Sequence, residues 1–235
     1  MDQVQRDIQA IYQKSAQALE AYFWPGKVAH LAIDWQRLYC DPNFILNQPH
    51  LQRTQKTVAV LDAVNDFADA VRITTPTWWV YHDPALTKDA FHPDYFLCMN
   101  PFTVERRIAQ FREEGQQLCG RVDPEVDVTL RKPFKDAFAG TDLHERLQRR
   151  EIDTLLITGL YRHYSYDIRR AQCVGQTMKA AADLGYNTFV VEDLTVDVVE
   201  PTEPSRLAVA QMTLSEGAHS LHSDQVRRIA EKFQP

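Results

Sequence analysis

The sequence predicts an α/β protein with a doubly wound, mostly parallel sheet that carries helices on both faces. Residues 152–160 form a nearly continuous apolar run, as expected of a central strand that is buried on both faces. Apolar positions at helical spacing follow in residues 171–184 and lead to Gly185, which suits a helix C-terminus. Strands and helices alternate in this way at least four times, which indicates repeated βαβ units.

The chain divides into an N-terminal helical extension, residues 1–27, and one α/β domain, residues 28–235. Residues 2–23 place their apolar side chains on one helical face, and Trp24-Pro25-Gly26 ends the helix. Further strands are expected at residues 28–34, 78–81, 126–132 and 187–193. Helices are expected at residues 54–72, 104–119 and 143–150, and a helical stretch with a break near Gly217 at residues 204–233. Residues 83–103 are expected to form a long surface excursion.

Composition excludes several classes of protein. Hydrophobic residues make up 44% and charged residues 25%, and no apolar run approaches the roughly 20 residues of a membrane span. The net charge of −6 gives no basic surface for nucleic acid. The N-terminus lacks the pattern of a secretory signal, so a cytoplasmic location is expected. The four cysteines are scattered and suggest neither a disulfide framework nor a zinc site.

Three reactive side chains stand where strands end or a helix begins: Asp34, Lys132 and Cys173. Open α/β sheets bind ligands beyond the carboxyl ends of their strands. An ammonium group and a helix N-terminus both lower the pKa of a thiol, and a carboxylate can take its proton. The set predicts covalent acyl transfer or hydrolysis, although each residue alone also fits an ordinary structural role.

The sequence resembles the isochorismatase-like cysteine hydrolases, a superfamily that includes nicotinamidases and carbamoyl-amide hydrolases. The resemblance rests on HLAIDWQ, LRKPFKDAFAGTDL, LLITGLY and CVGQTMKAAADLGYNTFVVEDLT, which follow one another in the family's order between about residues 28 and 195. It implies a Rossmann-like three-layer sandwich and a homo-oligomer. It also implies Asp34 as general base, Lys132 as activating cation and Cys173 as nucleophile, with Gln36 and backbone amides shaping the pocket and oxyanion hole.

The spacing before the cysteine departs from the family. Cys173 follows Gly159 by fourteen residues, whereas the family's cysteine follows its glycine by six. If the extra residues form a loop, Cys173 keeps its place. If the helix has instead gained about two turns, Ser165 takes the cysteine position. The segment GLYRHYS also resembles the turn of true isochorismatases, which hydrolyse a vinyl ether without a cysteine.

The side chains of this turn suggest the substrate. Arginine and histidine would surround a carboxylate or phosphate group, and tyrosines would supply flat walls, which favours a small anionic or aromatic substrate. The expected substrate contacts are Gln36, Tyr161, Arg162, His163 and Ser165. A solvated basic helix face with packing tyrosines is an equal alternative.

No cofactor is expected, and His82, Asp83, Asp89 and His92 do not form a recognisable metal-ligand set, so no required metal is expected. Three functions stay open: C–N hydrolysis of a small amide or carbamoyl compound, isochorismatase-type vinyl ether hydrolysis with Asp34 as acid, and an inactive family member that binds a small molecule or protein partner.

Overall fold

The computed structural model describes residues 2–41, 43, 51–83, 114–164, 167–197 and 202–234, and the side chains of 51–54 and 163–170 lie outside this description. The strands are β1 (Val28–Ile33), β2 (Thr77–His82), β3 (Val128–Lys132), β4 (Thr154–Leu160), β5 (His163–Tyr164), β6 (Asp167–Ala171), β7 (Asn187–Val196) and β8 (Ala218–Leu221). The helices are α1 (Gln3–Tyr22), α2 (Arg37–Cys40), α3 (Leu51–Val71), α5 (Leu143–Arg149), α6 (Cys173–Asp183), α7 (Glu203–Ser215) and α8 (Ser223–Glu231).

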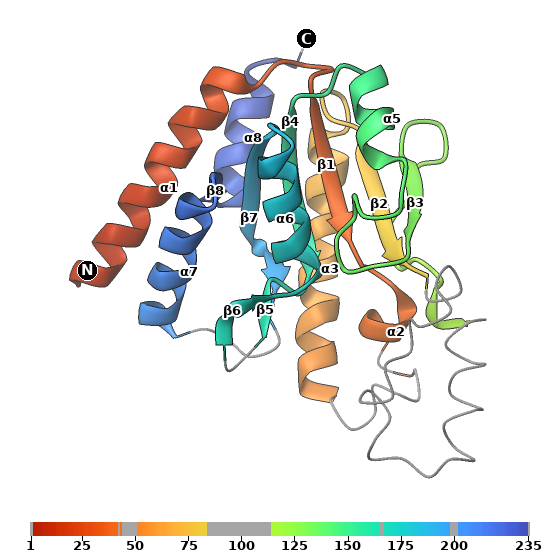
Figure 1. Ribbon diagram of the computed structural model, residues 1–235, viewed down its shortest axis with the longest axis horizontal. Coiled ribbons are helices and arrows are strands. Elements are labelled where there is room, and N and C mark those ends of the chain that lie inside the picture. Colours follow the sequence, from red (N-terminus) through yellow and green to blue (C-terminus); the bar gives the residue numbers. More distant parts are fainter. Residues whose placement is uncertain are drawn as a thin grey trace.

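Six strands form one parallel sheet in the order β3-β2-β1-β4-β7-β8 (Figure 1). The strand order reverses between β1 and β4, and such a reversal opens a crevice beyond the strand ends. Every residue of β1 and of β4 is buried, which explains their continuous apolar runs. The doubly wound sheet that the sequence predicts is therefore confirmed.

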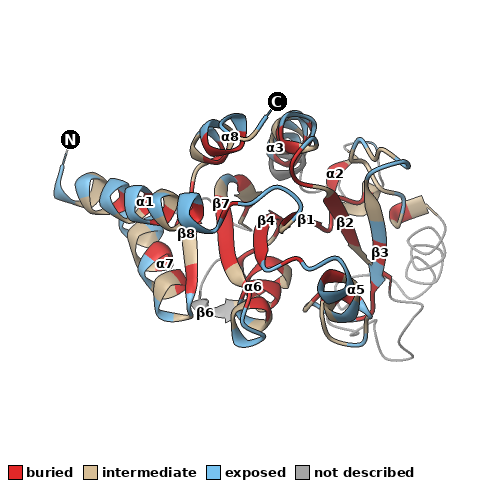
Figure 2. Ribbon diagram, turned by 90° about the horizontal axis from the view of Figure 1, so that it is seen from above, coloured by how far each residue is buried: buried red, intermediate tan, exposed pale blue. Residues whose placement is uncertain are grey.

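Helices cover both faces of the sheet (Figure 2). On one face α3 and α8 pack through residues such as Phe67 and Ile229, and on the other α5 and α6 pack through residues such as Leu147 and Met178. The N-terminal helix α1 lies along the β8 edge, where it contacts β8, α7 and α8. No helix within the described ranges has the length and apolar character to cross a bilayer.

Two polar side chains, His30 and Asp127, join neighbouring elements of the sheet through hydrogen bonds. The ring of His30 lies between the hydroxyls of Thr77 and Thr158, at 3.2 and 2.9 Å, and burial lowers its pKa to about 3. A neutral imidazole therefore links β1 to both of its neighbours. Asp127 accepts hydrogen bonds from Arg72 and Trp79 and ties α3 to the amino ends of β2 and β3.

Two sequence predictions need correction. The stretch 204–233 is interrupted by a short strand, β8, because residues 218–221 pair with β7. Residues 104–113 of the predicted helix 104–119 lie outside the described residues. Residues 117–119 are described and are not helical. Their backbone pairs with the segment after β1, where Arg37 N donates to Gln117 O and Cys119 N to Trp35 O.

Gly159, near the end of β4, cannot be replaced by alanine without strain. Its φ is 138°, and an added Cβ would lie 2.3 Å from the Ile33 carbonyl oxygen. We expect Gly159→Ala to lower the free energy of unfolding by about 2–5 kcal/mol, from backbone strain and overpacking. Gly26 also has a positive φ but no atom within 4 Å of an added Cβ, so Gly26→Ala is the matched control. Equal losses in urea unfolding of the two variants would contradict this expectation.

Candidate active site

Asp34 follows the last residue of β1 and is 1% exposed. Its backbone has a positive φ of 60°, and its N–H donates to Val80 O on β2 at 2.8 Å. Oδ2 accepts a hydrogen bond from Lys132 Nζ at 3.1 Å. Oδ1 is buried and has no hydrogen-bond partner among the described residues, so one carboxylate oxygen is free to accept a proton.

Lys132 ends β3, two strands away from β1, and its side chain is fully buried. Nζ donates to Asp34 Oδ2 and to the carbonyl oxygens of Phe134 and Lys135, both at 3.2 Å. Burial is the largest single influence and acts to lower the pKa of Lys132, but the interactions with Asp34 and Cys173 together outweigh it, so the pKa is raised. The ammonium is thus charged and held by three acceptors.

Cys173 is the first residue of α6 and is partly exposed, whereas Asp34 and Lys132 are buried behind it. Its thiol interacts electrostatically with both of them. The three predicted residues therefore converge at the carboxyl edge of the sheet, near the order reversal. The first N–H groups of a helix have no partner within that helix and carry partial positive charge.

The thiol pKa moves in the direction opposite to the sequence-based expectation. Burial raises the pKa of Cys173 to about 12, the Asp34 carboxylate adds to the rise, and Lys132 opposes it. The negative charge next to the sulfur, together with desolvation, thus outweighs the ammonium. The resting site holds a protonated thiol beside an Asp34–Lys132 ion pair.

The extra residues before Cys173 form a β-hairpin. Strands β5 and β6 pair antiparallel, and α6 begins only after them, at Cys173 (Figure 1). Of the two alternatives that the sequence left open, the inserted loop is therefore the one found, and a helix lengthened by two turns is wrong. Ser165 lies outside the described residues, and so do the side chains of His163, Tyr164, Arg169 and Arg170.

The structure corrects the role expected for Arg162. Its side chain is 3% exposed, and its guanidinium pairs with both carboxylate oxygens of Glu192 on β7. Asp197 Oδ2 lies 4.0 Å from the same guanidinium. Arg162 is therefore held in a buried ion pair through its two terminal nitrogens, and its Nε is buried without a hydrogen-bond partner among the described residues. Glu192 and Asp197 were missed; the available signal was an acid, Glu192, within the apolar strand TFVVED.

Gln36 and Tyr161, two of the expected substrate contacts, both contact other parts of the protein. The Gln36 amide exchanges two hydrogen bonds with the backbone of His82, at 2.9 and 3.0 Å, and so fixes the end of β2 against β1. The ring of Tyr161 is half-buried and packs edge-on against Tyr39 at 6.1 Å. Gln36 thus positions the backbone at the site.

Within the described ranges, no group of three or more His, Cys, Asp or Glu side chains could hold a metal ion. His82 Nε2 lies 3.2 Å from Pro133 O, and Asp83 pairs with Arg131 and accepts from Gln116. Asp89 and His92 lie outside the described residues.

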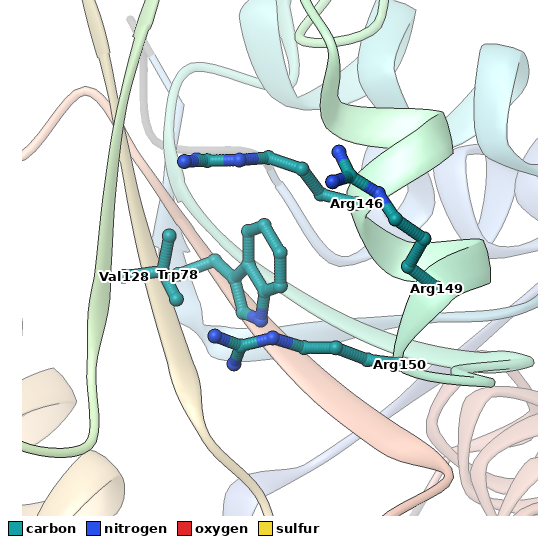
Figure 3. Close-up of a pocket in the computed structure, with 5 residues that line it drawn as sticks. All are labelled: Trp78, Val128, Arg146, Arg149 and Arg150. Carbon is teal, nitrogen blue, oxygen red and sulfur yellow. The ribbon is translucent and has the colours of Figure 1, made fainter.

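A separate hollow of about 180 Å³ lies at the amino ends of β2 and β3, at the opposite edge of the sheet from Cys173 (Figure 3). Trp78, Val128 and the three arginines Arg146, Arg149 and Arg150 line it. Arg150 lies over the Trp78 ring at 5.2 Å, and Arg146 pairs with Asp142 at 3.4 Å. The arginines cover a buried indole here, which is a packing role.

The raised pKa predicts how Cys173 reacts with iodoacetamide. A group that deprotonates near 12 gives an alkylation rate that rises about tenfold per pH unit from pH 7 to 10, without a plateau. Cys119 is an internal reference, because a hydrogen bond from Cys40 lowers its pKa.

Asp34→Asn removes a negative charge that raises the pKa of Cys173, so it should speed the alkylation of Cys173 at pH 8. Peptide-resolved mass spectrometry measures each cysteine; a Cys173 plateau below pH 9 would refute this.

Comparison with known proteins bears on the fold and the family of the chain. An uncharacterised isochorismatase family protein of Bacillus subtilis is 35% identical over 85 residues, which are 36% of this chain and only 41% of that relative's length. A cysteine hydrolase from Pseudomonas syringae pv. phaseolicola has a TM-score of 0.68 at 16% identity, over 90% of this chain and 97% of that chain. N-carbamoylsarcosine amidase from Thermoplasma acidophilum has a TM-score of 0.57 at 22% identity, over 84% and 97% of the two chains.

These solved structures share the fold. The strongest assignment comes from the sequence itself, because the family described as the isochorismatase domain matches residues 28–224. That range contains the whole sheet and all three converging residues, and the chain belongs to the isochorismatase family.

Proposed function

We propose that the protein hydrolyses a C–N bond of a small amide or carbamoyl compound through a thioester at Cys173. One observation carries the proposal: the Cys173 thiol, at the start of α6, interacts electrostatically with a buried carboxylate and a buried ammonium that lie 3.1 Å apart. Burying an ion pair costs free energy unless it is well compensated, so its presence beside the thiol supports a chemical role.

The reaction begins with attack of the Cys173 sulfur on the substrate carbonyl carbon. Because the thiol is protonated at rest, its proton moves to Asp34 Oδ1 as the C–S bond forms. The Cys173 N–H, at the start of the helix, supports the negative oxygen of the tetrahedral intermediate. Lys132 is paired with Asp34 before this step and favours negative charge on sulfur during it.

The intermediate then collapses. Asp34 gives its proton to the leaving nitrogen, ammonia or an amine departs, and a thioester is left on Cys173. A water molecule loses a proton to Asp34 and attacks the thioester, and the protonated Asp34 returns that proton to the sulfur. The products are a carboxylic or carbamic acid and the original thiol.

The relatives support this reaction class. Proteins of similar structure include an N-carbamoylsarcosine amidase and a nicotinamidase from Bacillus subtilis, the latter with a TM-score of 0.55 at 20% identity over 83% of this chain and 99% of that chain. A small anionic or aromatic substrate stays a prediction, as do a cytoplasmic location and a homo-oligomer. Light scattering after size exclusion measures the last.

The test is ammonia release from a panel of primary amides and carbamoyl compounds, followed by mass spectrometry of the protein during turnover. We expect at least one substrate to be hydrolysed and the Cys173 peptide to carry the acyl group. Isochorismate turnover that persists in Cys173→Ala would point instead to vinyl ether hydrolysis. A binding protein would show ligand-induced thermal stabilisation with no turnover.

A further inference from the structure

The first turn of α6 is held by the two residues that precede the inserted hairpin. Gln172 N donates to the Arg162 carbonyl at 2.8 Å, and Val174 N donates to the Tyr161 carbonyl at 3.1 Å. These bonds lie on either side of Cys173 in the sequence. The position of the Cys173 backbone therefore follows the position of residues 161 and 162.

Close packing also joins α6 to residue 162. Gly175 lies in the same turn of α6, and a Cβ added there would lie 2.6 Å from the Arg162 carbonyl oxygen. Real Cβ atoms essentially never approach another atom so closely, so the helix reaches this carbonyl only because residue 175 has no side chain. The contact between Arg162 and α6 is thus direct backbone packing.

Arg162 is fixed in turn by β7 and by the residue after it. Its guanidinium forms a two-pronged ion pair with Glu192, and its backbone N–H donates to Asp197 Oδ1 at 3.2 Å. Planar guanidinium–carboxylate pairing fixes orientation as well as distance. The side chain and the backbone of one residue therefore join β7 to the turn that carries Cys173.

The N-terminal helix closes this ion pair off from water. Tyr12 of α1 is 5% exposed, and its hydroxyl interacts electrostatically with Glu192 and Arg162. Its ring packs against His222 at 4.7 Å. An ion pair in such surroundings is stronger and more rigid than one in water.

We propose that Arg162 is a positioning residue, which holds the Cys173 thiol against Asp34 and Lys132 through its carbonyl bond to Gln172 and its ion pair with Glu192. This rests on the proposed function for its effect on turnover, but its effect on the thiol does not depend on any substrate. It also explains how the hairpin 163–171 is inserted without moving Cys173, because the carbonyl bond joins the two ends of the insertion.

The experiment compares Arg162→Gln with Arg72→Gln. Arg72 also pairs with a fully buried carboxylate, that of Asp127, but at the amino ends of the strands. The first readout is kcat and KM on the best amide substrate. The second is the rate of Cys173 alkylation by iodoacetamide at pH 8, and the third is the melting temperature.

We expect Arg162→Gln to lower kcat at least tenfold with less than a threefold change in KM, as loss of thiol alignment requires. In this variant the thiol moves away from Asp34, so its pKa should fall. The rate of Cys173 alkylation should then rise about tenfold for each pH unit by which that pKa falls. Arg162→Lys should recover part of both effects. Arg72→Gln should lower the melting temperature to a similar degree with neither effect.

Several results would overturn the proposal. If Arg162→Gln alkylates at the wild-type rate, or if Arg72→Gln accelerates alkylation equally, Arg162 has only a general stabilising role. Should Arg162→Gln fail to fold, Glu192→Gln keeps the arginine and removes the charge of its main partner, and it must show the same paired changes. Absence of amide turnover in the wild type would contradict the proposed function alone, because alkylation still decides the role of Arg162.

Discussion

Cys173→Ala is expected to lower kcat/KM for amide hydrolysis by about 10³-fold or more, because it removes the sulfur on which the proposed thioester would form. The fold should be unaffected, since Cys173 is partly exposed and its neighbours in α6 are held by other residues. Steady-state ammonia release measures the loss. The acylated peptide seen during wild-type turnover should also disappear.

Cys119→Ser is the matched control for this variant. Cys119 is also partly buried and carries a thiol of lowered pKa, but it interacts with Cys40 and lies in the segment beside residue 35. Its replacement should leave kcat/KM within about twofold of wild type. Amide turnover that survives in Cys173→Ala would refute the thioester route.

Lys132→Met is expected to abolish activity and to destabilise the fold by about 3–5 kcal/mol, because it leaves the Asp34 carboxylate buried without its partner. The loss should appear as a lower midpoint in urea unfolding. The carbonyl oxygens of Phe134 and Lys135 also lose their donor in this variant.

The double variant Asp34→Asn with Lys132→Met separates stability from chemistry. Removing both charges should return most of the lost stability, since no uncompensated charge is left in the interior. Activity should not return, because the proton acceptor is also gone. A double variant as unstable as Lys132→Met would show that the ion pair is not the source of the loss.

Much of the fold could be predicted, because a central strand that is buried on both faces appears in the sequence as a continuous apolar run. The apolar run of β4 and the helical spacing after Cys173 are consequences of that burial. The joint position of Asp34 and Lys132 was also predictable, since parallel strands end at one edge. Strand β8 was missed because it has only four residues, two of them polar, between two helices.

Other features depend on partners that are distant in the sequence. The turn GLYRHYS shows a basic residue, but nothing local indicates that Glu192 and Asp197 lie against Arg162. The thiol pKa was predicted in the wrong direction because it is a balance of burial and two opposite charges, and burial appears only in three dimensions. The hairpin strands have two and five residues, too short to separate from a helix by periodicity.

The bond from Gln172 N to Arg162 O has a consequence for how this family is searched and engineered. That bond joins the two ends of the insertion. The position of the Cys173 sulfur therefore does not depend on how many residues lie between Gly159 and Cys173. Searches that require a fixed interval between the glycine and the cysteine will overlook such chains. The same closure predicts that the sequence between residues 162 and 172 can be exchanged while Cys173 keeps its position.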